Sequence, residues 1–227
     1  MEFYSRKETC NMSYLGMEII DFNCLSDVKS LRSINKIELL KINQCKKMKL
    51  SYNNLISVLN IPEQIEMFDC SNNLLEKCCI LPNNLKILNC MQNKLALLDN
   101  LPPKLTHLEC SFNDLVNLDN LPINLIFLSC VGNQIVNLNF LPDKLEYLCC
   151  AGNKLTKLDD LPNSLKNLDC DGNKLVSLSN LPKSLKQLSC MSGETNLQLE
   201  NLPDLNKIFI CGNKLVKNTS IKSIVIR

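Results

Sequence analysis

The chain has 227 residues, of which 45% are hydrophobic and 21% are charged. This composition matches folded globular proteins and excludes a wholly disordered chain. The 25 Lys and Arg residues nearly balance the 23 Asp and Glu residues, giving a net charge of +2, which argues against a protein whose main task is to neutralise nucleic acid phosphates. Trp is absent and there is a single His, so few catalytic arrangements are open to the chain.

Residues 1–44 do not share the pattern that follows them. Ser26 could cap a short helix over the next few residues. Alternatively, residues 36–42 and 47–52 could form a hairpin that leads antiparallel into the first repeat. Either structure would cover the open end of a stacked core. We therefore expect residues 1–44 to form an N-terminal cap, with a separate docking module as the alternative.

From residue 45 onward the sequence repeats every 20 residues. Residues 81–100 read LPNNLKILNCMQNKLALLDN, and residues 101–120 read LPPKLTHLECSFNDLVNLDN. The common pattern is L-P-x-x-L-x-x-L-x-C-x-x-N-x-L-x-x-L-x-x, in which alternating apolar residues predict a short strand with one buried face. Because one unit cannot bury its own leucines, stacked units must share a core. The pattern predicts a β-rich solenoid, an arc with a parallel concave sheet.

Each unit has Pro at its second position, as in Pro82, Pro102 and Pro122. Pro has no backbone donor and disfavours a helix interior. The return segments are therefore expected to be extended or polyproline-like on the convex side. We expect residues 45–227 to contain about nine such repeats and a final strand around Ile221–Ile226. The edge of that strand would be open, which makes homodimerisation there an alternative function.

An Asn recurs in every unit and lies among apolar neighbours, so its amide must find hydrogen-bond partners. We predict a ladder in which each Asn side chain bonds the backbone of adjacent coils. Its members are Asn53, Asn73, Asn93, Asn113, Asn133, Asn153 and Asn173.

Half of the fourteen cysteines also recur every 20 residues, from Cys70 to Cys190. The spacing favours small buried hydrophobes over disulfides, and a metal site is least favoured because a row of thiols does not present tetrahedral ligands.

No apolar core follows the charged first ten residues, so no secretory signal is expected. We expect reduced thiols in a cytoplasmic protein, the cytoplasm of a host cell included. Outside the column, Cys149 is expected to face solvent and to alkylate first.

The solvent-facing strand residues of the concave sheet are expected to bind a partner. Aromatic residues, scarce in this chain, gather there at Phe112, Phe127 and Tyr147, and an exposed patch of this kind is typical of interaction sites. Cross-strand packing of the rings is the structural alternative. The predicted partner-binding residues are Ile87, Met91, His107, Glu109, Phe112, Phe127, Val131, Tyr147 and Cys149.

No catalytic or cofactor site is predicted. His107 lies near Glu109 in the sequence, but no nucleophile with a completing third group occupies a matching position. The isolated glycines at 132, 152 and 172 precede the ladder Asn and do not form a phosphate-binding loop. We expect no enzyme activity, no cofactor, no metal, no nucleic acid ligand and no membrane attachment.

The pattern resembles the leucine-rich repeat, in the short 20-residue form of bacterial type III effectors, with Cys where Val or Leu is common. It is also similar to repeat proteins of giant amoebal viruses. The resemblance covers residues 45 to about 216 and implies recognition of a partner protein. Some effectors add a ubiquitin-ligase domain with a C-x-D motif, which does not occur in this sequence. An adaptor role for a ubiquitin-ligase system, self-association through the C-terminal edge, and binding of a glycan or lipid are the alternatives.

Overall fold

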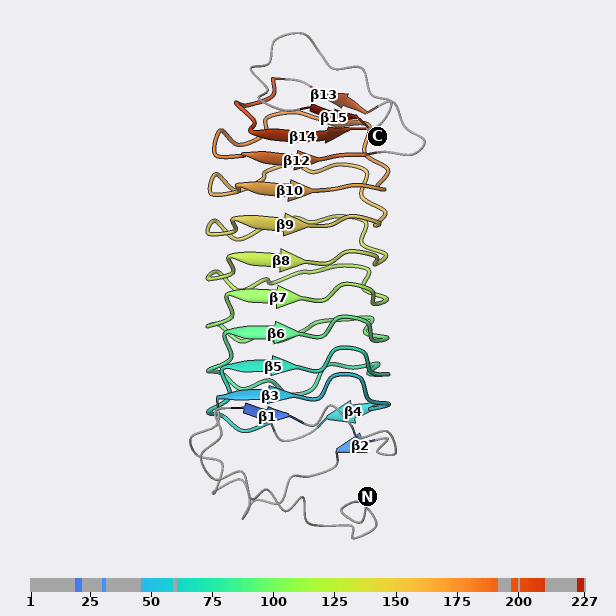
Figure 1. Ribbon diagram of the computed structural model, residues 1–227, viewed down its shortest axis with the longest axis vertical. Helices are drawn as coiled ribbons and strands as arrows, with labels where there is room; N and C mark the ends of the chain where they lie inside the picture. The colour runs from blue at the N-terminus through green and yellow to red at the C-terminus, as the bar shows by residue number, and fades with distance from the viewer. Residues whose placement is uncertain are drawn as a thin grey trace.

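The computed structural model describes residues 46–58, 61–191, 197–199 and 201–210, together with the backbone of 19–21, 30–31 and 224–226. An 11-stranded parallel sheet runs the length of the molecule in the order β1-β3-β5-β6-β7-β8-β9-β10-β12-β14-β15 (Figure 1). Its strands are β1 (Ile19–Asp21), β3 (Lys47–Lys49), β5 (Met67–Asp69), β6 (Ile87–Asn89), β7 (His107–Glu109), β8 (Phe127–Ser129), β9 (Tyr147–Cys149), β10 (Asn167–Asp169), β12 (Gln187–Ser189), β14 (Lys207–Ile210) and β15 (Ile224–Ile226).

The 20-residue period of the sequence becomes the register of this sheet. Leu88 pairs with Leu108, which pairs with Leu128 on the next strand. Each position of the repeat therefore forms a column along the solenoid, one residue per coil. The predicted β-rich solenoid with a parallel sheet is confirmed.

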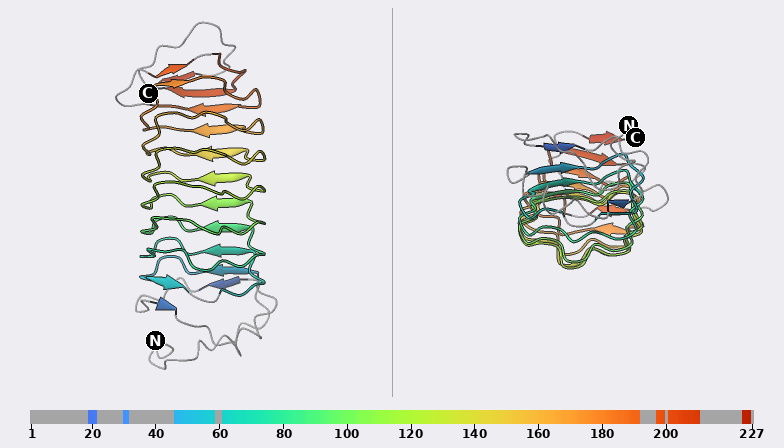
Figure 2. Two further views of the ribbon diagram at one scale, coloured as in Figure 1. Left: turned by 180° about the vertical axis from the view of Figure 1, so that it is seen from behind. Right: turned by 90° about the horizontal axis from the view of Figure 1, so that it is seen from below.

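The connecting segments on the opposite side are extended, and no helix occurs among the described residues. Two short two-stranded sheets lie outside the main sheet: β2 (Ser30–Leu31) with β4 (Ser57–Val58), and β11 (Ser177–Leu178) with β13 (Gln198–Leu199). The end-on view shows the coils superimposed around a common interior (Figure 2). The expected extended convex side is thereby confirmed.

Leucine columns fill that interior. In the coil of β6, Leu85, Leu88 and Leu95 are fully buried, and Cys90 lies beside them. Burying one such leucine contributes on the order of 2 kcal/mol before chain entropy is counted. Because the same positions are buried in the neighbouring coils, the core is continuous along the sheet.

The Leu-Pro pair that opens each unit forms a turn into the strand. The amide of Leu85 donates to the carbonyl of Pro82 at 3.1 Å, and Leu105 donates to Pro102 at 3.0 Å. The prolines at this position are buried in the successive units from Pro82 to Pro182. Pro thus fixes the backbone before the strand and supplies the acceptor of the turn, in addition to withholding a donor.

The asparagine ladder forms as predicted. The Asn113 amide nitrogen donates to the carbonyls of Cys90, Cys110 and Ser111 at 3.0–3.2 Å. Its oxygen accepts the amide of Leu95, in the preceding coil, at 3.0 Å. The same bonds recur at the other ladder positions that follow Asn53. Each Asn therefore joins two coils and satisfies backbone groups that the turn would otherwise leave unpaired.

Two columns of residues adopt left-handed backbone angles where the coil changes direction. One column directly precedes the ladder Asn and contains Phe112 (φ 55°) and Gly132 (φ 64°). The second ends each unit and contains Asn100, Asn120, Phe140, Asp160 and Asn180. Asn, Asp and Gly are the residues that tolerate this conformation best. Phe140, which is 94% exposed, is the exception in the second column.

Gly132 differs from the equivalent Gly152 in what a methyl group would meet. A Cβ on Gly132 would lie 2.7 Å from the Phe112 ring, whereas one on Gly152 would meet only backbone, at 3.5 Å. Both Ala substitutions incur the left-handed penalty of about 1–2 kcal/mol. We expect Gly132→Ala to cost roughly 1 kcal/mol more than Gly152→Ala in chemical denaturation, because of this overlap. Adding Phe112→Ala should remove the difference; an unchanged difference would contradict the explanation.

The strands at the two ends of the main sheet can be compared with those expected from the sequence. β1 pairs with β3 in parallel, and β5 occupies the other edge of β3. The antiparallel hairpin alternative is therefore wrong for Lys47–Lys49, because both edges of that strand carry parallel neighbours. The helix expected after Ser26 lies outside the described residues. At the other end, β15 pairs in parallel with β14, so the expected final strand is present.

Candidate functional site

Three rings stack across the middle of the concave sheet. His107 of β7 lies 6.0 Å from Phe127 of β8, ring centre to ring centre, with an angle of 19° between the planes. Phe127 lies 6.4 Å from Tyr147 of β9, tilted by 37°. Parallel register brings them together, since all three occupy the third position of the strand segment, counted from its first Leu. We call His107, Phe127 and Tyr147 the aromatic stripe.

The stripe is partly open to solvent. Tyr147 is 39% exposed, and Ile87, which pairs with His107 from β6, is 37% exposed. Phe127 is half-buried between its two ring partners. Ring contacts of this kind contribute about 0.5–1.5 kcal/mol beyond burial. The stripe is therefore both a packed element of the sheet and a surface that another molecule can contact.

Phe112 does not extend the stripe. Its left-handed backbone places the ring against Gly132 in the turn after the strand, where it is 52% exposed. Met91 and Val131 lie beside the same turn and are half-buried, and the amide of Val131 donates to the Ser111 hydroxyl at 3.0 Å. These three predicted site residues flank the stripe at the rim of the sheet.

The fifth position of the strand segment carries carboxylates that accept bonds from the following turn. Glu109 accepts the amide of Ser111 at 3.0 Å, and Asp169 accepts the amide of Asp171 at 3.2 Å. Burial raises the pKa of Asp169 above the ordinary aspartate value. Glu109 is thus held in place on the concave face, two strands from Cys149, the half-buried predicted site residue of β9.

The bonds of His107 and Glu109 do not join them into a catalytic pair. The His107 ring nitrogen Nδ1 lies 2.9 Å from the Thr106 hydroxyl, and Glu109 is engaged with the Ser111 amide. The sequence proximity of the two residues therefore reflects two separate local bonds. Among the described residues, no group of three or more His, Cys, Asp or Glu is arranged to hold a metal ion.

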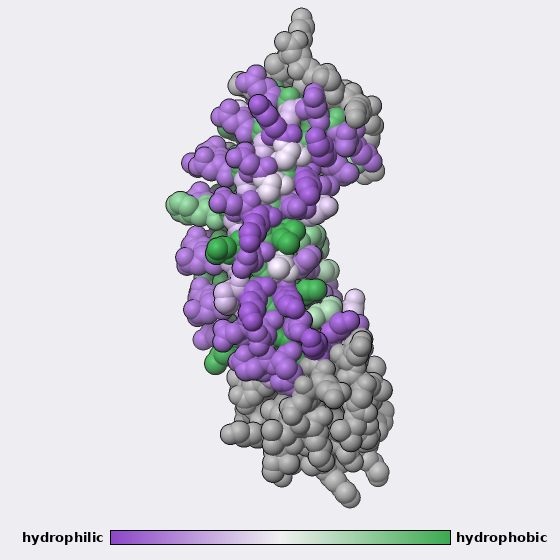
Figure 3. Space-filling view, turned by 90° about the vertical axis from the view of Figure 1, so that its left-hand side faces the viewer, coloured by the Kyte–Doolittle hydropathy of each residue, from purple (hydrophilic) through white to green (hydrophobic). Residues whose placement is uncertain are grey.

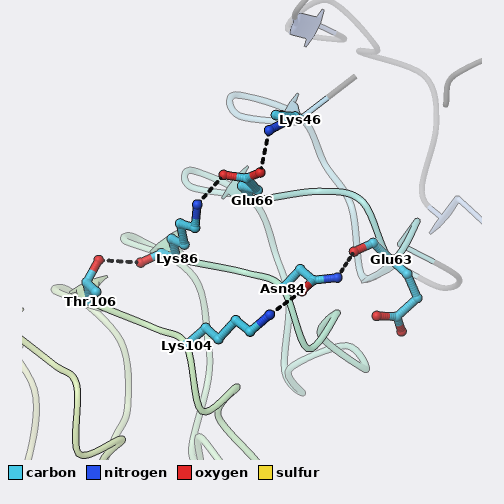
Figure 4. A network of polar contacts seen from close by, with 7 residues as sticks. All are labelled: Lys46, Glu63, Glu66, Asn84, Lys86, Lys104 and Thr106. Atoms are coloured by element: carbon cyan, nitrogen blue, oxygen red, sulfur yellow. Dashed lines mark hydrogen bonds and ion pairs between the residues drawn. The ribbon is translucent and has the colours of Figure 1, made fainter. Parts of the chain in front are cut away.

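The edge of the solenoid at which the strands begin is mostly hydrophilic, with scattered hydrophobic residues (Figure 3). Glu66 bridges Lys46 at 2.7 Å and Lys86 at 2.6 Å (Figure 4). Hydrogen bonds from both lysines lower the pKa of Glu66 to about 2. Lys104 donates to Asn84, whose amide in turn donates to the carbonyl of Glu63. Opposite charges on this edge therefore neutralise one another from coil to coil.

The described cysteines are free thiols, and those of the column are buried. Burial raises the pKa of Cys110 well above its usual range, so column thiols are poor nucleophiles. The pKa of Cys149 is raised to about 11 by burial and by the nearby carboxylates of Asp169 and Glu109. The structure therefore does not favour Cys149 as the first site of alkylation.

Cys78 differs from the other described cysteines. It stands where the next coil has the buried Leu98, and with Cys79 it lines a cavity of about 740 Å3. The Cys79 thiol hydrogen-bonds to Cys78 and lowers the pKa of Cys78, while the pKa of Cys79 is raised. The two thiols thus line an open hollow, and the Cys78 thiol ionises more readily than its neighbour.

We predict that limited iodoacetamide at pH 7 alkylates Cys78 before the other nine described cysteines, Cys149 included. The thiolate is the reacting species, and only Cys78 among these ten has a lowered pKa. Mass spectrometry of the peptides measures the order of labelling. A Cys79→Ser variant, which replaces the thiol donor, should change the Cys78 rate and leave Cys149 unaffected. Faster labelling of Cys149 than of Cys78 would contradict the prediction.

No family model matches the chain, and no curated protein matches it either. Solved structures do match. YopM from Yersinia enterocolitica WA-314 superposes with a TM-score of 0.68 at 28% identity over 81% of this chain. A Shigella effector LRR domain gives 0.62 at 29% identity, covering 83% of this chain and 85% of its own length. This chain covers only 43% of the YopM chain.

A third structure shares the fold at lower identity. The functional domain of InlJ from Listeria monocytogenes, described as including a cysteine ladder, gives a TM-score of 0.61 at 24% identity over 85% of this chain and 50% of that one. In the part of the chain that the structure describes, no segment forms an apolar helix of the length that a membrane span requires.

Proposed function

We propose that this chain, a leucine-rich repeat solenoid similar to those of bacterial effectors, is a non-catalytic module that binds a partner protein on its concave sheet. The aromatic stripe carries the proposal, because stacked rings that remain partly exposed provide a contact area whose geometry is already fixed. Rigid aromatic anchors supply much of the binding energy at protein interfaces. The similarity to effector structures supports the same class of function.

The proposed contact surface consists of the predicted residues, with the stripe at its centre and Met91, Phe112 and Val131 at its rim. The rigid parallel register supports this role, since side chains on neighbouring strands keep a fixed spacing of about 4.8 Å. Binding of a partner to the stripe would cost little entropy on the side of this protein, because its side chains are already ordered.

We place the protein in a reducing compartment such as the cytoplasm, because the described cysteines are free thiols.

Affinity capture with matched truncations tests this function. Phe127→Ala together with Tyr147→Ala should reduce capture of the partner from cell extract at least tenfold, since hot-spot truncations cost about 2 kcal/mol or more. Ile123→Ala is the control, because Ile123 is 73% exposed and lies in the turn before β8. Thermal unfolding verifies that all variants fold. Equal capture by the wild type and the double variant would exclude the stripe as the contact.

Self-association is a second candidate, favoured by one observation. β15 is the last strand in the order of the main sheet, and an exposed strand edge can pair with another chain. Light scattering over a range of concentrations distinguishes the two candidates. A mass that rises with concentration supports pairing between copies, and a constant monomeric mass excludes it.

A further inference from the structure

From β5 to β12 the charged residues of the concave face are all acidic, whereas Lys47 and Lys49 of β3 and Lys207 of β14 occupy the same positions nearer the two ends of the sheet. Between Met67 and Met191, the third, fifth and seventh positions of every strand segment contain no Lys or Arg. The same columns contain four acidic residues, which are Asp69, Glu109, Asp169 and Asp171. The whole chain has a net charge of +2, so the part of the concave sheet from β5 to β12 differs in charge from the rest of the molecule. We call these four residues the acidic group.

The turns explain the position of the acidic group but not its charge. Asn89 accepts the amide of Met91 in the same way that Glu109 accepts that of Ser111. A neutral amide oxygen therefore performs the same structural role at the fifth position. Asp171 accepts both the Ser189 hydroxyl and the Met191 amide through one oxygen, Oδ1. The carboxylates are held in place while their side chains stay partly exposed.

The acidic group flanks the aromatic stripe. Glu109 and Asp169 lie on β7 and β10, three strand spacings or about 14 Å apart, with Phe127 and Tyr147 on the two strands between them. A cation can therefore meet a ring face and a carboxylate at once. The sheet already makes such a contact within itself, because the Lys207 ammonium lies 4.5 Å above the Phe209 ring centre in β14.

We propose that the concave sheet binds an extended cationic segment of its partner, in which Lys or Arg alternates with apolar residues. This inference rests on the proposed function and adds the chemistry of the partner. Arg or Lys side chains would pair with the acidic group, and the apolar side chains would pack on the aromatic stripe. Complementary charge steers association and selects against partners of the wrong sign. The polyanionic backbone of a nucleic acid would be repelled by the same carboxylates.

Fluorescence anisotropy with two synthetic peptides tests the sign of the charge. The probe is a labelled eight-residue peptide alternating Arg and Leu, and its counterpart has Glu in place of Arg. We expect the Arg peptide to bind at least tenfold more tightly than the Glu peptide. Its affinity should fall as the salt concentration rises from about 0.05 M to 0.5 M, because salt screens exposed charges.

Amide variants isolate the charge from the turn bonds. The triple variant Glu109→Gln, Asp169→Asn, Asp171→Asn retains the acceptor oxygens, and we expect it to keep its melting temperature and lose at least tenfold in affinity for the Arg peptide. The control is Asp119→Asn, Asp143→Asn, Asp160→Asn, which removes the same charge from exposed positions off the sheet. The control should bind like the wild type.

Two results would overturn the inference: equal affinity for both peptides, or unchanged binding of the Arg peptide by the triple amide variant. Its failure differs from a failure of the proposed function. If the captured partner depends on Phe127 and Tyr147 but docks through an acidic segment, the module stands and the charge assignment is wrong. If capture ignores the stripe while the Arg peptide still binds through the acidic group, the stripe fails as the partner contact.

Discussion

Replacing Asn113 with Ala should destabilise the protein by about 3 kcal/mol, the upper end of the range for leaving a buried group unpaired. The side chain is only 7% exposed and serves four backbone groups from two coils. Ala would leave the Leu95 amide without its acceptor in a dry turn. The measurement is the free energy of unfolding by urea, read from the loss of β-sheet circular dichroism.

The Asn113→Asp variant separates the acceptor role of the Asn113 side chain from its donor role. It would keep the acceptor for the Leu95 amide but set a carboxylate against three carbonyl oxygens, so we expect at least the loss seen with Ala at pH 7. Protonation removes the repulsion, so the Asp variant should regain part of its stability at pH 4. The control is Asn163→Ala at an exposed position, which should change stability by less than about 0.5 kcal/mol. An Asn113→Ala loss as small as this would contradict the ladder.

The elements predicted well from the sequence are those that depend on position within the repeat. Residues such as Leu88, Cys90 and Asn93 have equivalents in the neighbouring coils. Because each of these positions has the same surroundings in every coil, it needs the same type of residue, and the sequence repeats. The left-handed corner that ends each unit follows the same rule, although its recurring residues, such as Asn100 and Asn120, were not among the predicted features. Asn and Asp recur there because they tolerate a positive φ.

Features confined to one coil could not be predicted in this way. Phe112 was expected to join Phe127 on the concave face, but the left-handed turn that carries it directs the ring onto Gly132. The Cys78–Cys79 hollow is likewise confined to one coil, in which Cys78 stands at the position of Leu98 in the next. A residue that breaks the 20-residue repeat in one coil only has no equivalent elsewhere in the sequence. Its structural effect depends on how the side chains around it pack. The same holds for the site, whose ring contacts follow from register but whose partner does not.

Leu128→Ala should cost about 3 kcal/mol, within the range for truncating a buried leucine. Leu128 is fully buried in β8 between Leu108 and Leu148 on the adjacent strands. The backbone bonds on both sides hold those strands in register, so they cannot close on the space that the side chain leaves. Cys130→Ala, two residues along the same buried face, removes only a thiol and should cost about 1 kcal/mol. Urea denaturation of both variants measures the difference, and equal losses would contradict a core filled mainly by leucine.

The position of Leu128 in the array makes a second outcome observable. In a solenoid each coil contacts only its neighbours, so stability is the sum of coil and interface terms. A weakened interface in the middle should let the two halves unfold in separate steps, broadening the transition and lowering its apparent slope. Met48→Ala in β3, also buried but near one end of the sheet, should shift the midpoint with less broadening. If the central variant unfolds as sharply as the terminal one, cooperativity extends beyond adjacent coils and the nearest-neighbour description fails.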